Sequence, residues 1–153
     1  MLDLSKLMQV TSSQQIEEDH TDWSIQRLFY DDLRSILGIE PEGFIKGFYG
    51  GSRVIVDPPP TDTDNDLVLL VDSVECFHEA LDQFSWDTPH DMEYGGKRDT
   101  FATFRKGEYN LMVFEDATEF GAVLGATAVA KRINIKSKME RYALFETARS
   151  PWR

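Results

Sequence analysis

The apolar run Leu67-Val68-Leu69-Leu70-Val71 follows directly on the polar triplet Asp64-Asn65-Asp66. A short apolar run after polar residues predicts a strand, from Asp66 to Val71. Side chains two positions apart on a strand point to the same face, so Asp64 and Asp66 are expected side by side. Two carboxylates in that position offer hard oxygen ligands to one divalent cation, or to two adjacent ones.

The triplet Gly50-Gly51-Ser52 lies upstream of these acids and predicts a turn of small residues. Such a turn lets backbone N–H groups approach a phosphate closely. Carboxylates suited to Mg²⁺ beside a turn that accepts phosphate form the arrangement that phosphoryl or nucleotidyl transfer requires. Taken separately, both features have simpler explanations: the glycines as an ordinary turn, and the acids as turn residues before a strand.

Length and composition set the class of protein. The 153 residues, 41% of them hydrophobic, are enough for one globular domain with a proper core. No apolar run approaches the roughly 20 residues that cross a bilayer, and the N-terminal residues do not resemble a signal peptide. One cysteine, Cys76, excludes an internal disulfide and is expected to be buried or half-buried in its helix. These features predict a soluble protein of the cytoplasm with no membrane partner.

The net charge of −11 is unevenly distributed. Residues 131–153 contain seven Lys or Arg and two Glu, a balance of +5, which leaves −16 for residues 1–130. So acidic a body repels long nucleic acid, and no extended duplex is expected as a partner. The basic C-terminal helix could meet a triphosphate or a short stretch of nucleic-acid backbone. It could equally be a solvated helix face whose charges suit the helix dipole.

The order of predicted elements indicates the fold class. Residues 1–20 are expected to form an arm or short helix, and residues 21–153 a single domain. The predicted elements are a helix from Asp22 to Gly38, a strand 44–49, an extended connection 53–63, the strand 66–71, a helix from Ser73, a hairpin of 100–105 and 109–114, and helices 117–133 and 137–148. Strands in the middle and helices at both ends, without regular alternation, predict an α+β fold. We expect a small mixed sheet flanked by helices that pack on one side of it.

The turn Gly50-Gly51-Ser52-Arg53, ten further residues, and then Asp64-Asn65-Asp66-Leu67 together resemble the signature of the nucleotidyltransferase superfamily with the polymerase β-like fold. In that family a Gly-Ser pair ends one strand and an Asp-x-Asp motif opens the next. The resemblance covers roughly residues 22–116. It looks closest to small stand-alone versions carried by tailed phages, which would imply the host cytoplasm as the location.

The resemblance implies roles for these residues. Asp64 and Asp66 would be ligands of Mg²⁺ (or Mn²⁺), and Gly51 and Ser52 would bind the β- and γ-phosphates of an incoming NTP. The neighbouring Gly50 belongs to the same turn and is also expected to contribute to cofactor binding. Arg53 would neutralise phosphate charge, or is simply a surface residue.

The sequence departs from the family pattern at the third acid. Where a later strand should carry an aspartate, this chain has Asn110. An amide can coordinate a metal through its oxygen, but it brings no charge and cannot act as a base. Glu108, two residues earlier, could substitute as a catalytic carboxylate if the hairpin turn points it inward. Asp99 and Glu115 are alternatives in a poorer register.

Two functions from different classes follow. The first is a metal-dependent nucleotidyltransferase that moves a nucleoside monophosphate from an NTP to a hydroxyl of a small molecule, a protein side chain or an RNA end. The second is a module that keeps the fold and nucleotide affinity but acts by binding a partner protein. Asn110 favours the second, and the intact Gly-Ser and Asp-x-Asp motifs favour the first. The aromatic residues Trp23, Trp86, Tyr94 and Phe101 could stack on a base but are expected mainly in the core.

Overall fold

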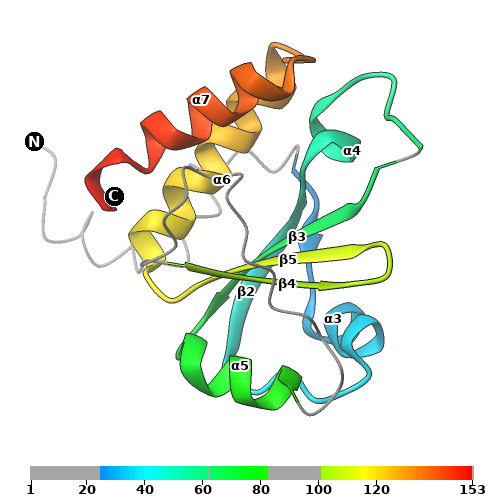
Figure 1. Ribbon diagram of the computed structural model, residues 1–153, viewed down its shortest axis with the longest axis vertical. Coiled ribbons are helices and arrows are strands. Elements are labelled where there is room, and N and C mark those ends of the chain that lie inside the picture. The colour runs from blue at the N-terminus through cyan, green and yellow to red at the C-terminus, as the bar shows by residue number, and fades with distance from the viewer. Residues whose placement is uncertain (1–24, 62, 83–100, 153) are drawn as a thin grey trace, which may run out of the picture.

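A computed structural model describes residues 25–61, 63–82 and 101–152 of the chain (Figure 1). Five strands form one mixed sheet in the order β1-β2-β3-β5-β4. The strands are β1 (Arg27–Leu28), β2 (Phe44–Gly50), β3 (Asn65–Val71), β4 (Phe101–Lys106) and β5 (Tyr109–Phe114). The central pair β3 and β5 is parallel, and the other neighbours are antiparallel.

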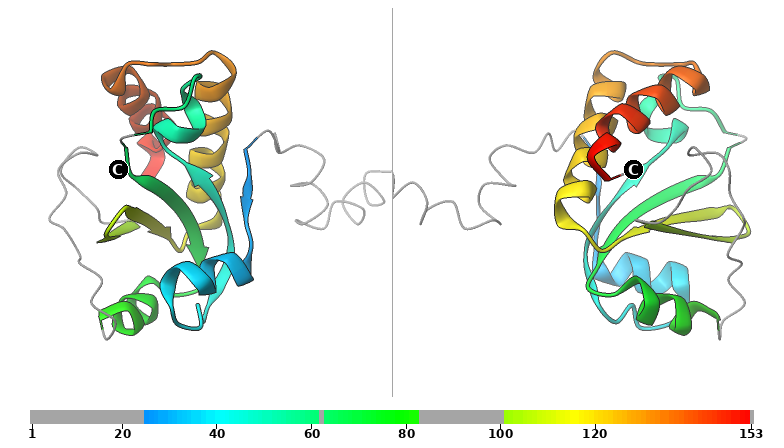
Figure 2. Two further views of the ribbon diagram at one scale, coloured as in Figure 1. Left: turned by 90° about the vertical axis from the view of Figure 1, so that its right-hand side faces the viewer. Right: turned by 60° about the vertical axis from the view of Figure 1, so that its left-hand side comes forward.

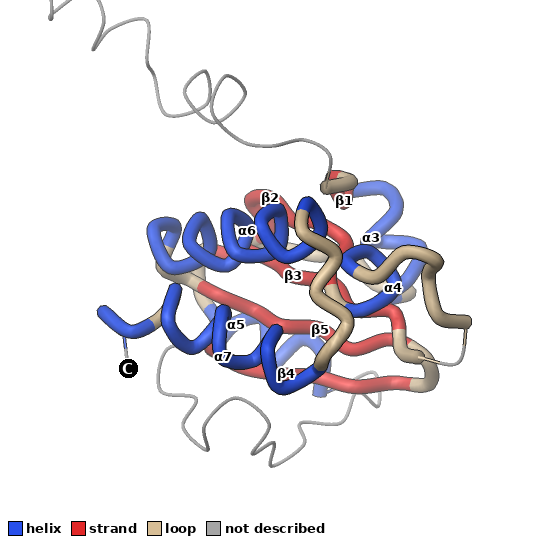
Figure 3. The backbone as a smooth tube through the Cα atoms, turned by 90° about the horizontal axis from the view of Figure 1, so that it is seen from above, coloured by secondary structure: helices blue, strands red, loops and turns tan. Residues whose placement is uncertain are grey.

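Helices cover both faces of this sheet (Figure 2). The helices are α3 (Tyr30–Leu37), α4 (Ser52–Ile55), α5 (Val74–Asp82), α6 (Ala117–Arg132) and α7 (Lys138–Ala148), followed by the 3₁₀ turn η1 (Ser150–Trp152). Helices α3 and α5 pack on one face, whereas α6 and α7 run side by side over the other (Figure 3). The predicted α+β class, with a mixed sheet flanked by helices, is confirmed.

The expectation that the helices pack on one side is wrong, and the apolar run in β3 explains why. Leu67 and Leu69 are buried in the core under α3 and α5, while Val68 and Leu70 are buried in the core under α6. A central strand that is apolar at successive positions has two hydrophobic faces, and both must be shielded from water. Each face of the sheet therefore has its own hydrophobic core.

The first predicted helix begins later than expected. Gly38 ends α3 in a left-handed conformation (φ 76°), as predicted, but the helix starts at Tyr30 instead of Asp22, which lies outside the described residues. Leu28 lies opposite Gly47 in the pairing of β1 with β2, so this segment makes sheet hydrogen bonds. The helical spacing of apolar residues did not indicate a strand here. Ile25 and Leu28 fit that spacing, but they are buried in different cores, one on each face of the sheet.

The connection after β2 also differs from the prediction. Ser52–Ile55 forms the short helix α4 and not an extended segment, and Ile55 is buried. The hairpin of β4 and β5 and the two C-terminal helices lie where the sequence predicted them. Cys76 is exposed, contrary to expectation, whereas Phe101 is a core residue as expected.

The predicted N-terminal arm, Trp23, Trp86 and Tyr94 lie outside the described residues. In the described ranges, no helix is both long and apolar enough to cross a membrane.

Candidate functional site

Four residues line up across neighbouring strands at one end of the sheet. Gly50 of β2 pairs with Asp66 of β3, Asp66 pairs with Asn110 of β5, and Asn110 pairs with Arg105 of β4. The two-residue turn between β4 and β5 sets the last of these pairs. We call these four residues the cross-strand row; it lies on the α6–α7 face of the sheet, in line with Val68 and Met112.

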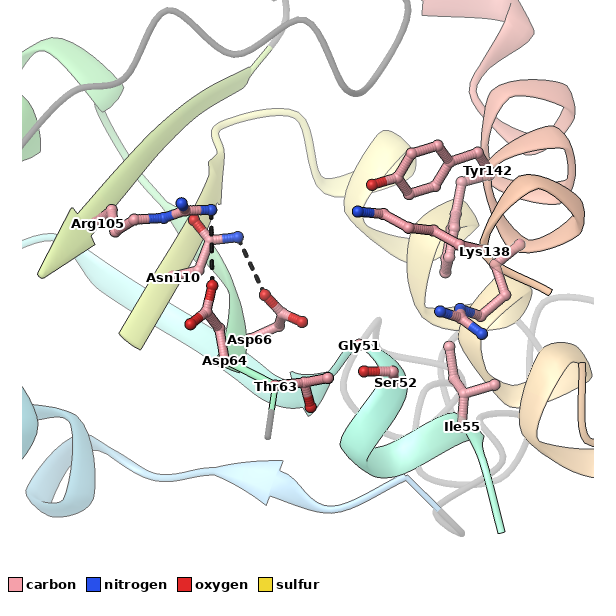
Figure 4. A pocket seen from close by; sticks show the side chains of 12 residues that line it. Gly51, Ser52, Ile55, Thr63, Asp64, Asp66, Arg105, Asn110, Lys138 and Tyr142 are labelled. Carbon is pink, nitrogen blue, oxygen red and sulfur yellow. Dashed lines mark hydrogen bonds and ion pairs between the residues drawn. The ribbon is translucent and has the colours of Figure 1, made fainter. Parts of the chain in front are cut away.

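The acidic side chains of this region each contact a donor from β4 or β5 (Figure 4). The Asn110 amide nitrogen Nδ2 donates a hydrogen bond to Asp66 Oδ1 at 3.0 Å. The Arg105 guanidinium lies 3.6 Å from Asp64 Oδ2, in an ion pair whose side chains are 47% and 45% exposed. Asn110 is buried, with 5% of its surface exposed. One carboxylate therefore has an amide partner and the other a cationic partner.

Gly51 brings the turn directly against Asp66. Its φ of 73° is in the left-handed region, which side chains disfavour. A Cβ atom at this position would lie 1.8 Å from Asp66 Oδ2. A glycine is therefore required twice at this position, by backbone conformation and by the approach of the carboxylate. The predicted turn and the predicted acid are in contact.

A cavity of about 290 Å³ opens beside this contact. One wall comes from the sheet end and the turn, and the facing wall from α7 (Figure 4). The lining residues are Gly51, Ser52, Ile55, Thr63, Asp64, Asp66, Arg105, Asn110, Lys138, Arg141, Tyr142 and Phe145. The cavity thus has carboxylates on the sheet wall and two cationic side chains on the helical wall.

Helix α7 supplies the basic wall, and it touches the core through the partly buried Phe145. No residue within Lys138–Ala148 is buried. The helix starts at Ser137, whose hydroxyl accepts the N–H of Glu140 at 3.3 Å. Arg141 Nη1 donates to the carbonyls of Ile135 and Lys136, at 3.1 and 2.8 Å, and these bonds hold the guanidinium beside the cavity that Arg141 lines.

Two sets of contacts hold this wall in place. After α7, Arg149 is 2% exposed and pairs with the fully buried Glu119 of α6 at 3.3 Å, while its guanidinium lies 4.3 Å from the centre of the Phe101 ring. Before α7, Asn134 and Asp57 exchange two hydrogen bonds, of 3.0 and 3.3 Å. The second contact ties the α6–α7 connection to the loop after α4. The helical wall is therefore held in place by contacts that lie outside the cavity.

A narrower space of about 30 Å³ continues inward from the same point. It is lined by Gly51, Asp66, Val68, Met112, Val123, Thr127, Phe145 and Arg149. Gly51 and Asp66 border both spaces, so they lie at the junction between the polar cavity and an apolar recess.

The structure brings together most of the predicted site residues but not all. Gly51, Ser52, Asp64, Asp66 and Asn110 all line the cavity, and Gly50 is the neighbour of Asp66 in the cross-strand row.

Arg53 is placed away from the cavity. Its guanidinium donates to the Thr63 carbonyl at 2.8 Å, to Asn65 Oδ1 at 3.2 Å and to the Thr61 carbonyl at 3.3 Å. Arg53 therefore holds the loop that leads into β3, and through that loop it supports the position of the acids.

The carboxylates proposed to replace the third acid also lie elsewhere. Glu108 is exposed in the hairpin turn and does not line the cavity, although its carbonyl accepts the N–H of Asn65 at 2.7 Å. Glu115 accepts the N–H of Val74 at the start of α5, at the other end of the sheet. Asp99 lies outside the described residues.

Arg105, Lys138, Arg141 and Tyr142 were not predicted individually as site residues. The basic composition of residues 131–153 did indicate that a C-terminal helix could meet a phosphate group. Arg105 could have been found from the hairpin, because a two-residue turn at Gly107-Glu108 makes positions 105 and 110 a pair.

The oxygen ligands of the cavity suit a divalent cation that is already bound to a phosphate ligand. In the ranges covered by the structure, no group of three or more His, Cys, Asp or Glu side chains is placed to hold a metal ion. Mg²⁺ is commonly bound by one or two carboxylates, waters and substrate phosphates, so a complete protein cage is unnecessary. Asp64 and Asp66 fit that pattern, whereas Asn110 turns its amide nitrogen toward Asp66.

No family model matches the sequence, and no curated protein matches it either. Among solved structures, the chain is similar to the conserved protein GrpB from Enterococcus faecalis. The two share 15% sequence identity with a TM-score of 0.49, over 84% of this chain and 99% of that one.

Proposed function

We propose that the cavity binds a nucleoside triphosphate with Mg²⁺ or Mn²⁺ and transfers its nucleoside monophosphate to a hydroxyl acceptor. The observation that carries this proposal is the contact of Gly51 with Asp66 in a cavity whose opposite wall is basic. The resemblance of the Gly-Ser and Asp-x-Asp motifs to the nucleotidyltransferase superfamily supports it, as does the order of the elements that carry them.

The charges of the cavity suit a triphosphate with its cation. Lys138 and Arg141 offer positive charge from α7, and the Ser52 hydroxyl offers a donor from the turn. Charge-assisted hydrogen bonds to phosphate are about twice as strong as neutral ones. The phosphate tail would therefore lie between the turn and α7, and the nucleoside would lie toward Tyr142 and Phe145.

Asp64 and Asp66 would hold the divalent cation, which supplies charge neutralisation at the phosphates when it is bound. The chain's own residues fix where these carboxylates lie. Gly51 leaves room for Asp66, Asn110 orients it by a hydrogen bond, and Arg105 restrains Asp64.

In the reaction, the acceptor oxygen forms a bond to the α-phosphorus as the bond from that phosphorus to the pyrophosphate oxygen breaks. The acceptor hydroxyl gives up its proton, and pyrophosphate leaves with the bridging electron pair. Asp64 and Asp66 are the carboxylates of the described cavity lining, so the proton would pass to one of them or to water.

The test is incubation of the purified protein with α-labelled NTPs, Mg²⁺ or Mn²⁺, and a cell lysate as the source of acceptor. We expect label in an acceptor with the wild type and none with Asp64→Ala/Asp66→Ala. Glu75→Gln, an exposed acid in α5 at the far end of the sheet, is the matched control and should label normally. Equal labelling by wild type and the double variant would overturn the proposal.

One observation favours a second function, nucleotide binding without transfer. Asn110 presents its amide N–H to Asp66, and Glu108 lies outside the cavity. A module of this kind would bind a nucleotide and contact a partner protein. Calorimetric NTP binding that is lost in Asp66→Ala, with no label transfer under any condition, would support this second function over the first.

A further inference from the structure

Arg105 lies in the cross-strand row and forms an ion pair with Asp64, one of the two acids of the site. It is next to Asn110 in strand pairing and 3.6 Å from Asp64 by its guanidinium. Neither motif of the family resemblance includes it. Its position is fixed by backbone register, since the turn at Gly107 sets 105 opposite 110 and the parallel pairing sets 110 opposite 66.

The Arg105 guanidinium neutralises the negative charge of Asp64, which a bound metal ion would also neutralise. Arg105 cannot coordinate a metal, because its guanidinium is always protonated and has no acceptor atom. The guanidinium therefore competes with a metal cation for the Asp64 carboxylate, and its positive charge repels that cation. The opposing effect is largest for a bare divalent ion and smaller for one that arrives with phosphates, which offer the guanidinium a second anionic partner.

We infer that Arg105 is a built-in counter-ion of Asp64 that a divalent cation must displace, so that the free protein binds metal weakly. The inference rests on the proposed function only in placing the cation at Asp64 and Asp66. It adds that a residue outside the motifs sets the metal affinity of this site and favours a cation delivered together with a triphosphate.

The test is calorimetric titration of the full chain with Mn²⁺ alone, without nucleotide. Arg105→Gln should bind Mn²⁺ about fivefold or more tightly than the wild type, since it removes one competing ion pair and one repulsive charge. Arg105→Lys keeps the charge and should stay near the wild-type affinity. Lys106→Gln removes the same charge from the next residue, which does not line the cavity, and should change affinity by less than about twofold.

The outcomes separate clearly. The gain in Mn²⁺ affinity caused by Arg105→Gln should vanish when Asp64→Asn is also present. That result would show that the gain depends on the Asp64 carboxylate. Equal or weaker Mn²⁺ binding by Arg105→Gln, or no binding by either protein, would overturn the inference. Because the titration contains no nucleotide, a failure of the proposed function would show separately, as absence of NTP binding by the wild type.

Discussion

Gly51 approaches Asp66 so closely that a single methyl group at residue 51 would overlap the carboxylate, with 1.8 Å between the added Cβ and Oδ2. The turn and the acid come from different strands, so this approach is a tertiary contact and not a local one. It makes the position of Asp66 depend on the absence of a side chain at residue 51.

Gly51→Ala should therefore destabilise the protein strongly, by about 3 kcal/mol or more, through backbone strain and overlap together. Gly38→Ala is a control for positive φ, because Gly38 has a φ of 76° and no atom within 4 Å of an added Cβ, although its ψ of 9° differs from the −170° of Gly51. It should cost only about 1–2 kcal/mol. Urea denaturation of both variants measures the difference, and Asp66→Ala should partly rescue Gly51→Ala. Equal costs at the two glycines would contradict the contact.

Divalent cations should raise the melting temperature of the wild type. At a metal concentration ten times Kd, the stabilisation is about 1.4 kcal/mol, or about 3–6 °C for a domain of this size. Asp66→Asn should lose most of this rise, and Glu75→Gln should keep it. Thermal denaturation with and without Mn²⁺ checks this, and identical shifts in wild type and Asp66→Asn would place the cation elsewhere.

Affinity for nucleotides should follow the phosphate tail and not the base. Each donor that faces the tail is used only when the tail is present, so binding should weaken about tenfold or more from NTP to NMP. Ser52→Ala should weaken NTP binding about fivefold, the effect of one hydrogen bond. Ser35→Ala, on α3 away from the cavity, is its control. Calorimetry with a nucleoside that binds as tightly as its triphosphate would refute this placement.

Asn110→Asp should destabilise the protein without metal by about 1–3 kcal/mol, because a donor to Asp66 is replaced by a like charge. The same variant should gain more stability from Mg²⁺ than the wild type does. Thermal melts with and without metal test both effects, and a variant unchanged in both would show that residue 110 does not face Asp66.

Glu108→Gln should change the rate of nucleotidyl transfer by less than about twofold, since the side chain lies outside the cavity. Loss of a general base costs on the order of 10²-fold or more, so rate measurement distinguishes the two cases clearly. A loss of that size would show that Glu108 reaches the reacting groups.

Tyr30 should make the protein sensitive to alkaline pH. Its hydroxyl hydrogen-bonds to Glu40, and this bond raises the pKa of Tyr30 above its usual value of 10.0. Because the pKa is raised in the folded state, the associated stability is complete below pH 10 and is lost as pH rises through the folded pKa. The urea midpoint should fall more between pH 9 and pH 11 for the wild type than for Tyr30→Phe, and parallel curves would exclude the effect.

Local sequence signals predicted the elements whose hydrogen bonds are local or whose turns are defined by glycine. The hairpin around Gly107, the end of α3 at Gly38 and helices α6 and α7 are of this kind. Strand β1 was missed because its two residues are a strand only through pairing with β2. Long-range pairing of so short a segment leaves no periodic pattern in the sequence.

The site residues also fall into those that local sequence signals predict and those that only the whole fold brings together. Two short sequence motifs contain Gly51, Ser52, Asp64 and Asp66, and the residue types in these motifs indicate phosphate and metal binding. Arg105 and Lys138 reach the cavity through strand register and the packing of a terminal helix, which are properties of the whole fold. The sequence could indicate a basic C-terminal helix but could not indicate where it would lie.

The C-terminal wall is fastened at its ends, by Asn134 before α7 and by Arg149 after it, while the helix between them buries no residue. The contacts that hold this segment in place therefore lie at other positions than the side chains that line the cavity. Side chains of α7 that line the cavity, such as Lys138 and Tyr142, are not buried, so we expect their exchange to cost little folding stability. If the proposed function holds, α7 is therefore a segment where ligand preference could change by mutation with little effect on the fold.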